Sequence, residues 1–337
     1  MAERFLITTA GLEQLFAALE AAGRRILAPT ARDGRTELCP VARFAEVSLD
    51  ALQTALGAKE TAFPRAERLL SYRMAPGRVE LEGAEPEVPP AVLFGVRPCE
   101  AAAFASLDAV FNWDTRDAFF NARMAQLTVV GVSCTQADAA CFCTSVGGGP
   151  GATKGSDLLL TPLADGAFLA EVLTEKGRAL RDLAPDAFAP GDADKEARLA
   201  PLPAAFDAGA LREKLGGLFE HPLWAEQSLR CIGCGACAYV CPTCACFDLQ
   251  EEADRRAGQR LRTWDSCGFA QFTLHASGHN PRETQGQRWR QRVYHKLKYF
   301  PERFGFPMCV GCGKCSRACP ADMNLKEHLV QAAEVAL

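Results

Sequence analysis

Apolar side chains near the start of the chain recur with the spacing of a helix. Leu12, Leu15 and Leu19 fall on one side of such a helix. Gly23 follows them and suits the left-handed conformation that ends many helices. Residues 11–23 therefore predict a first helix with one buried face.

Two short apolar runs have the length and composition of buried strands. They are "AVLFGV" (91–96) and "LTVVGVSC" (127–134), and neither alternates with polar residues as a half-exposed strand would. Between them, residues 99–111 are rich in alanine and predict a helix. This order predicts an α/β unit whose two strands are parallel and joined by a right-handed crossover.

Two further segments complete the expected organisation. Residues 157–173 predict a β-hairpin that turns at Asp165-Gly166. Residues 183–206 are rich in Pro, Ala and Asp without periodicity, which is typical of a linker. Because a domain commonly has about 100 to 200 residues, two domains are expected. We place an α/β domain at 1–205 and a cysteine-rich domain at 206–337.

Composition narrows the class of protein. No apolar run approaches the ~18 residues of a membrane span. The N-terminus carries Glu3 and Glu13 and lacks a basic region followed by an apolar one, so we expect no secretory signal and a cytoplasmic protein. A formal net charge of −4 argues against general nucleic-acid binding and favours protein partners. Sixteen cysteines in such a chain indicate metal binding or catalysis rather than disulfides.

One cysteine pattern occurs twice in the C-terminal half. "CIGCGACAYVCP" (231–242) and "CVGCGKCSRACP" (309–320) both have the spacing C-x2-C-x2-C-x3-C-P. In this pattern three thiolates bind one 4Fe-4S cluster and the fourth reaches the other cluster. Zinc sites built from cysteine pairs explain the repeated run poorly. The expected ligands are Cys231, Cys234, Cys237 and Cys319 for the first cluster, and Cys309, Cys312, Cys315 and Cys241 for the second.

The motifs also set the expected fold class. Their glycines, at 233, 235, 311 and 313, allow unusual backbone dihedrals around a cluster, and their amides can donate to cluster sulfurs. The fold class expected is α+β. An N-terminal α/β domain precedes a mostly helical C-terminal domain that resembles a two-cluster bacterial ferredoxin.

Four more cysteines lie at or near the C-terminal ends of the two predicted strands: Cys99, Cys134, Cys141 and Cys143. In an open α/β sheet this edge is where ligands bind. Four thiols there favour a third metal centre, either a 4Fe-4S cluster or a structural zinc ion. The alternative is that they are unreactive cysteines that pack as small apolar side chains.

Three thiols, Cys244, Cys246 and Cys267, form a set that is one short of a complete site. Three interpretations stay open. The thiols pack over the clusters, they are ligands with a fourth from the N-terminal domain, or they form a redox-active thiol site. Cys39 stands alone in an expected loop and is assigned no role.

The segment "QRWRQRVYHKLKYF" (287–300) predicts an amphipathic helix. Its basic residues Arg288, Arg292 and Lys296 recur every four positions and share one face. We interpret this face as solvated. Docking onto an acidic patch of a protein partner is the alternative.

Taken together, these motifs resemble the iron-sulfur beta subunit of cytoplasmic sulfhydrogenases and the corresponding iron-sulfur subunit of anaerobic sulfite reductase. The resemblance spans most of the chain in order. It is carried by "FGVRPCE" (94–100), "GVSC" (131–134), "CFC" (141–143), "HPLW" (221–224), "CIGCGACAYVCPTCACF" (231–247), "WDSC" (264–267), "SGHNPR" (277–282), "RWRQRVYHK" (288–296) and "CVGCGKCSRACP" (309–320).

The resemblance implies an electron-transfer subunit of an oxidoreductase complex in anaerobic metabolism. Such a subunit passes electrons between a flavin subunit that handles NAD(P)H and a separate catalytic subunit. Among relatives the catalytic partner is a hydrogenase, a sulfite reductase or a subunit of heterodisulfide-reductase type. Glu100 departs from the family, in which Asp usually follows the cysteine.

The residues themselves favour a non-catalytic role. The sequence supplies no nicotinamide or flavin fold and no pair of a nucleophile and a base. The preferred function is therefore electron transfer through two, and with the N-terminal cysteines three, metal centres. The alternative is a sulfur or disulfide reductase that acts at a thiol site beside a cluster.

Overall fold

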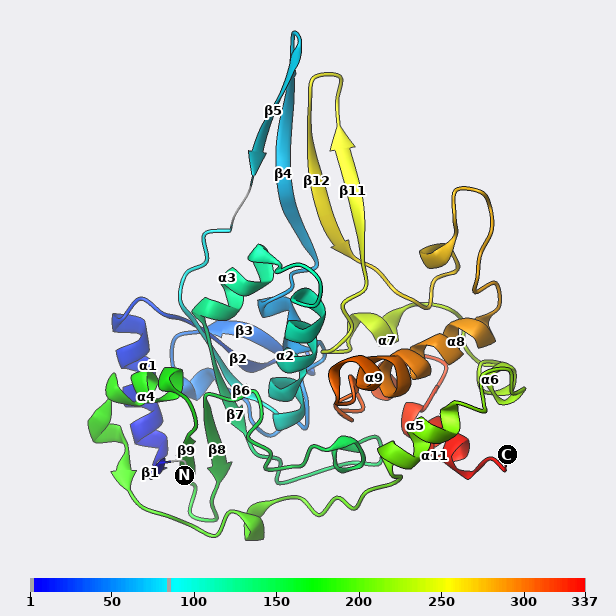
Figure 1. Cartoon of the computed structure of the whole chain (residues 1–337). Helices are drawn as coiled ribbons and strands as arrows, with labels where there is room; N and C mark the ends of the chain where they lie inside the picture. Colours follow the sequence, from blue (N-terminus) through cyan, green and yellow to red (C-terminus); the bar gives the residue numbers. More distant parts are fainter. Residues whose placement is uncertain (1–2, 84–85, 337) are drawn as a thin grey trace.

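The computed structural model describes residues 3–83 and 86–336. Figure 1 shows a large sheet with helices beside it, a helical C-terminal part next to the sheet, and an arm of two long β-hairpins that projects away from both. No helix in the described residues is long and apolar enough to cross a membrane.

The large sheet has eight strands in the order β10-β1-β9-β8-β7-β6-β2-β3. The pairs β2–β6, β6–β7 and β7–β8 are parallel, and the other pairs are antiparallel. The strands are β1 (Glu3–Ile7), β2 (Arg25–Arg32), β3 (Arg35–Val41), β6 (Ala91–Val96), β7 (Leu127–Val132), β8 (Leu158–Pro162), β9 (Phe168–Val172) and β10 (Ala189–Pro190).

This sheet confirms the parallel strands expected at 91–96 and 127–134 and the hairpin that turns at Asp165-Gly166. One feature of the segment 183–206 was not anticipated. It contributes β10, which pairs with β1 at one edge of the sheet.

Helices cover both faces of the large sheet, which explains why β6 and β7 read as continuous apolar runs. Val92 and Phe94 pack on the side of α1 and α4, whereas Leu93 packs with residues of α2 and α3 on the other side. The helices expected at 11–23 and 99–111 are confirmed. The bounds are α1 (Thr9–Ala21), α2 (Pro98–Phe111), α3 (Ala118–Gln126) and α4 (Glu175–Asp182).

The C-terminal part is mostly helical, as expected. Its core packs around Trp224, Trp289, Tyr294 and Leu329. A π-helical turn, His295–Tyr299, joins α8 to α9. The helices are α5 (Ala208–Leu215), α6 (Leu223–Gln227), α7 (Ala236–Tyr239), α8 (Gln285–Tyr294), α9 (Phe300–Phe304), α10 (Lys314–Arg317) and α11 (Leu325–Glu334).

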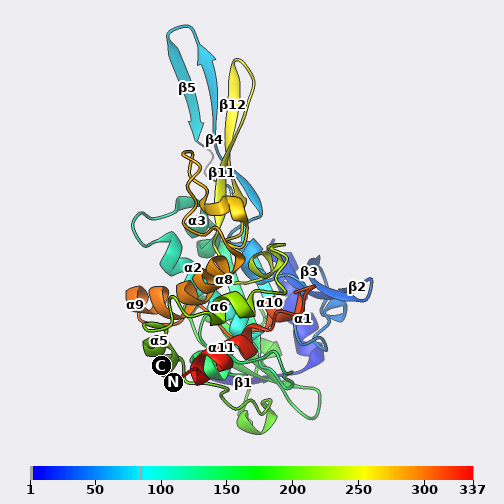
Figure 2. The same ribbon diagram turned by 90° about the vertical axis from the view of Figure 1, so that its right-hand side faces the viewer.

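The arm is a four-stranded sheet in the order β11-β12-β4-β5. Figures 1 and 2 show it standing clear of the rest of the molecule from two directions. β4 pairs with β12, so the arm joins strands from both sides of the boundary expected at residue 205. The strands are β4 (Ala66–Ala75), β5 (Arg78–Gly83), β11 (Phe247–Ala253) and β12 (Ala257–Trp264).

The β4–β5 hairpin of the arm has one apolar and one polar face, although solvent reaches both. The strand register pairs Met74 with Val79 and Tyr72 with Leu81, which places these side chains on the same face. Met74, Val79 and Leu81 are among the exposed large hydrophobic residues. At the base of this face the chain buries charges, because Arg262 of β12 pairs with Glu67 of β4 and with Asp117.

Candidate metal centres

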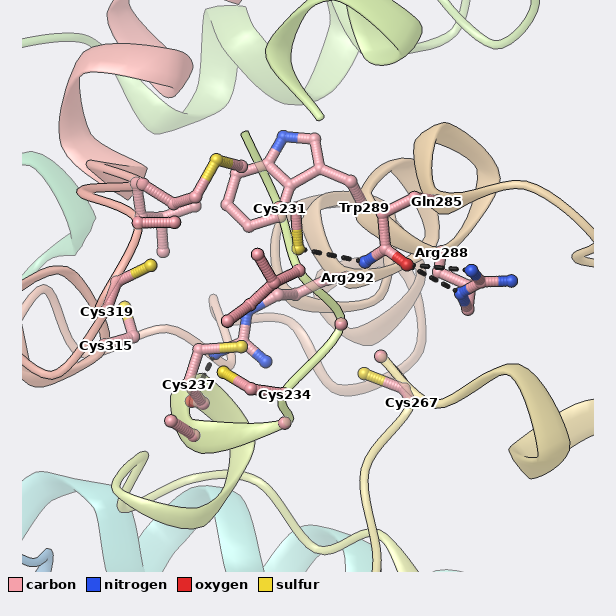
Figure 3. A pocket seen from close by; sticks show the side chains of 18 residues that line it. Cys231, Cys234, Cys237, Cys267, Gln285, Arg288, Trp289, Arg292, Cys315 and Cys319 are labelled. Atoms are coloured by element: carbon pink, nitrogen blue, oxygen red, sulfur yellow. Dashed lines mark hydrogen bonds between the residues drawn. The ribbon is translucent and has the colours of Figure 1, made fainter. Parts of the chain in front are cut away.

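The first cysteine motif surrounds a cavity in the C-terminal part. Cys231, Cys234 and Cys237 line it, and Cys319 of the second motif lies on the same wall. Figure 3 shows these four thiols around the cavity, with Cys315 close to Cys319. The structure thus brings together the four residues that the crossed pattern assigns to the first cluster.

The second group contains Cys241, Cys309, Cys312 and Cys315. The pKa of Cys309 is raised to about 11, mainly by burial; Lys296 opposes the shift, and Cys241 and Cys315 contribute to it. Cys312 is buried beside the same two thiols, and its pKa is also raised. Cys241 therefore lies with the second motif rather than with the motif in which it occurs. Cys315 reaches both groups, so the two groups are neighbours.

Glycines shape the two motifs in the way the sequence suggested. Gly233, Gly235, Gly311 and Gly313 all have positive φ, between 64° and 75°. Gly235 and Gly313 immediately precede α7 and α10, the short helices that contain the third cysteine of each motif and lead to the fourth.

Two of the glycines have a second role, which the sequence did not reveal. A Cβ on Gly311 would lie 2.5 Å from the backbone of Cys143, and one on Gly313 would lie 2.5 Å from the carbonyl oxygen of Ala140. The amide of Phe142 also donates to the carbonyl of Gly311 at 2.9 Å. The second motif thus packs directly on the loop that carries Cys141 and Cys143.

The basic face expected on the helix at 287–300 is not solvated. Arg292 and Lys296 are only 4% and 3% exposed. One nitrogen of Arg292 donates to the carbonyl oxygen of Cys237 at 2.6 Å. The Nζ of Lys296 donates to the Sγ of Cys241 at 3.4 Å and to Thr243 at 2.9 Å. The interpretation as a solvated face is therefore wrong for these two residues, which point at the cysteine groups.

A third buried cation, Lys59, reaches the same region from the N-terminal part. Its Nζ donates to the carbonyl oxygens of Ala238 and Cys244, at 3.1 and 3.0 Å, and lies 3.9 Å from the centre of the Trp264 ring. Burial lowers the pKa of Lys59 despite the thiols nearby. Nothing in the sequence around Lys59 indicated that it would reach the cysteine groups.

These cations fit an anionic group bound by the cysteines. No carboxylate in the described residues forms an ion pair with Lys59, Arg292 or Lys296, and a buried charge without a counter-charge is costly. The Nε of Arg292 is buried without any hydrogen-bond partner in the described chain. A thiolate-ligated 4Fe-4S cluster carries net negative charge and sulfur acceptors, so the residues present suit it.

Neutral and charged donors also contact individual thiols. Gln285 Nε2 donates to Cys231 Sγ at 3.0 Å. The Oε1 of the same amide accepts a hydrogen bond from Arg288, as Figure 3 shows. Arg317 donates to Cys141 Sγ at 3.1 Å. Hydrogen bonds to ligand sulfurs stabilise their negative charge and tune the potential of a cluster.

The four N-terminal cysteines lie together and beside the second group. The pKa of Cys134 is raised to about 11, mainly by burial; Arg97 opposes the shift, and Cys143 and Cys141 contribute to it. Burial also raises the pKa of Cys99, with contributions from Cys312 and Cys134. Cys99 lies in α2, directly after β6, and the other three cysteines follow β7. The thiols therefore meet at the carboxyl edge of β6 and β7, where the sequence predicted them.

Glu100 links the same region to the second motif. Its carboxylate lies 3.2 Å from the Nζ of Lys314, and both side chains are buried. The residue that departs from the family pattern therefore holds the N-terminal part against α10. Cys39 also differs from expectation, because it is buried within β3 rather than placed in a loop.

The remaining three thiols line a second cavity at the base of the arm, together with His295, and Cys267 also lines the cavity of the first group. Cys244 contacts the thiol of Cys241, and Cys246 contacts that of Cys267. The contact with Cys246 lowers the pKa of Cys267 to about 6, although burial opposes this shift. Among the described residues, no three His, Cys, Asp or Glu side chains converge closely enough for a single metal ion.

Comparison with known proteins agrees with this geometry. Residues 230–323 match the model of the 4Fe-4S dicluster domain, which contains all eight motif cysteines. The fold and the site thus define an iron-sulfur protein of the dicluster class. No solved structure matches the chain significantly.

The relationship extends beyond this domain. The chain is 34% identical over 239 residues to the sulfhydrogenase 2 subunit beta of Pyrococcus furiosus, which covers 68% of this chain and 70% of that protein. The chain belongs to the sulfhydrogenase beta-subunit family, and it is an iron-sulfur electron-transfer subunit of a hydrogenase-like oxidoreductase.

Proposed function

We propose that the chain relays electrons between a flavin subunit that handles NAD(P)H and a catalytic subunit, through a row of neighbouring metal centres. The observation that carries the proposal is the adjacency of the three cysteine groups. Cys315 lies between the first cavity and the second group, and Cys312 lies beside Cys99 of the N-terminal set. A row of this kind provides a path through the protein.

The residues around the row would hold the centres and set their properties. A 4Fe-4S cluster supplies one-electron transfer when it is bound. Cys231, Cys234, Cys237 and Cys319 would bind the first, and Cys241, Cys309, Cys312 and Cys315 the second. Arg292 and Lys296 would offset the negative charge of the bound clusters, because they contact Cys237 and Cys241.

The role as a relay is tested by isolating the protein with its partners. A tagged chain purified without oxygen is expected to bring with it a catalytic redox subunit together with a flavin subunit, both identified by mass spectrometry. NAD(P)H should then bleach the visible absorbance of the complex but not that of the isolated chain. Bleaching of the isolated chain by NAD(P)H would contradict the relay.

The crossed ligation is tested by counting iron in nested variants. In a chain with Cys231, Cys234 and Cys237 all changed to serine, the further change Cys319→Ser should remove no more iron, because all four would serve one cluster. Adding Cys241→Ser instead should remove about four more iron atoms. The reverse result would show that each motif keeps its own fourth cysteine. Cys39→Ser provides the baseline.

A third 4Fe-4S cluster at Cys99, Cys134, Cys141 and Cys143 is part of the proposal. The double variant Cys134→Ser/Cys141→Ser should lose about four iron atoms per chain, whereas the signals of the two motif clusters persist. Loss of zinc instead of iron would identify the structural zinc alternative. An unchanged metal content would show that these thiols bind no metal and pack as small apolar side chains.

A further inference from the structure

The cavity at the base of the arm, named here the arm-base cavity, contains thiols that neither cysteine motif uses. Its walls include Cys244, Cys246, Cys267 and His295, with Arg282 and Lys296 beside them. None of these four residues belongs to a cysteine motif, and Cys267 lies where the arm-base cavity and the cavity of the first group meet.

The chain brings these thiols together by means of the β11–β12 hairpin. Cys246 directly precedes β11, and Cys267 follows β12 by three positions. Phe247 pairs with Trp264, and the amide of Asp265 donates to the carbonyl oxygen of Cys246 at 3.0 Å. Closing the hairpin therefore forces two cysteines that are distant in sequence into contact.

His295 reaches the cavity through a local irregularity of the helix. It is the first residue of the π-helical turn that follows α8. A π-helical turn changes which side chains share a face, and such turns are frequent at functional sites. The turn places an imidazole, a common metal ligand, on a wall that already carries three thiols.

The space and the charge of the arm-base cavity indicate a negatively charged group. If the three thiols only packed over the clusters, they would fill this space, but Cys246 and Cys267 remain partly accessible. Arg282, Arg292 and Lys296 line the cavity, and no Asp or Glu side chain among the described residues does. A cluster bound by three thiolates is anionic and would satisfy these cations.

We infer that Cys244, Cys246 and Cys267 hold a further iron-sulfur cluster in the arm-base cavity, with His295 as its fourth ligand. The fourth ligand does not come from the N-terminal part. Among the described residues, that part contributes only Val110 to the cavity wall, and valine cannot bind a metal. Cys244 contacts Cys241, so the cluster lies next to the second group. It would form the end of the row nearest the arm.

The test is metal analysis of the full chain purified without oxygen. The variant Cys246→Ser/Cys267→Ser should lose about two to four iron atoms per chain, together with equal sulfide, and keep the signals of the other clusters. Unchanged iron, or a loss of zinc in place of iron, would overturn the inference. Cys39→Ser, which alters a lone buried cysteine, should lose no metal.

Two measurements remain decisive if the double variant does not fold. In the unmodified protein, alkylation under native conditions should spare Cys246 and Cys267; their ready modification would show free thiols and overturn the inference. Labelling histidine with ¹⁵N should produce a nitrogen coupling in pulsed EPR of the reduced protein that His295→Cys abolishes without loss of iron. A coupling that survives this change would remove His295 as the ligand.

The result is separable from that of the relay. If Cys231→Ser lost iron and Cys246→Ser/Cys267→Ser did not, the proposal of the motif clusters would stand. Only the arm-base cluster would then be rejected. Iron in the arm-base cavity would also exclude a free redox-active thiol pair there.

Discussion

Replacement of Arg262 by alanine is expected to lower the free energy of unfolding by about 3–5 kcal/mol, the usual cost of breaking a buried ion pair from one side. Arg262 and Glu67 have side chains only 5% and 4% exposed. The Nε of Arg262 donates to Glu67 at 2.7 Å, and its guanidinium also pairs with Asp117. Without the arginine, two carboxylates at the base of the arm lose a counter-charge. Arg123, which pairs with Glu67 at 2.7 Å, compensates in part.

Denaturant titration of the chain and of the variant measures this difference. Arg260→Ala is a matched control, because Arg260 lies on the same face of β12 and pairs with Glu251 while both side chains are 40% exposed or more. Exposed pairs contribute about 0–1 kcal/mol, so the control should change little. Equal effects of the two substitutions would mean that burial of the Arg262 network does not stabilise the fold.

The second large effect concerns reduction potentials. Arg292→Met and Lys296→Met are each expected to lower the potential of the nearest cluster by on the order of 100 mV, the Coulomb energy of two charges about 5 Å apart at an effective dielectric of about 20. Reduction adds an electron to an already negative group, and a buried cation favours the reduced form. Lys296 should act mainly on the cluster of Cys241, which it contacts, and Arg292 on that of Cys237.

Redox titration followed by EPR reports these potentials without any measure of turnover. Lys298→Met is the control on the same helical segment, because Lys298 pairs with Glu302 at the surface. If Lys298→Met shifted the potentials as much as Lys296→Met, the effect would come from net charge rather than from the buried position. Unshifted potentials in Arg292→Met would show that its cation does not face a cluster.

The motif cysteines were predictable because their information is local. A run such as 231–242 brings three thiols together within one turn of chain, whatever the rest of the fold does. The two buried strands and the helix between them were readable for a similar reason, since a strand covered on both faces has few polar residues. Neither inference needed a contact between distant segments.

The charged residues of the site were not predictable in the same way. Arg292 and Lys296 have the four-residue spacing of a solvated face, and only a buried anion makes their burial favourable. Lys59 reaches the site from an irregular segment of the other half. The π-helical turn that presents His295 also breaks the periodicity on which sequence reasoning depends.

The arm escaped prediction because its strands carry many charges. Residues 247–264 read as a polar stretch, and β11 is exposed along its whole length. Its pairing partner lies in the other half of the chain. No local pattern indicates that β12 should pair with β4, because the stabilising contact joins residues as far apart as Glu67 and Arg262.

The shared arm has a consequence for synthesis on the ribosome. Glu67 and Arg262 are 195 positions apart, so the first hairpin is complete long before its partner exists. At roughly 5–20 residues per second, the wait is about 10 to 40 s. During that interval the edge of β4 that later pairs with β12 has no partner, which is the condition under which nascent strands pair wrongly. The protein is therefore expected to depend on chaperones until β12 emerges.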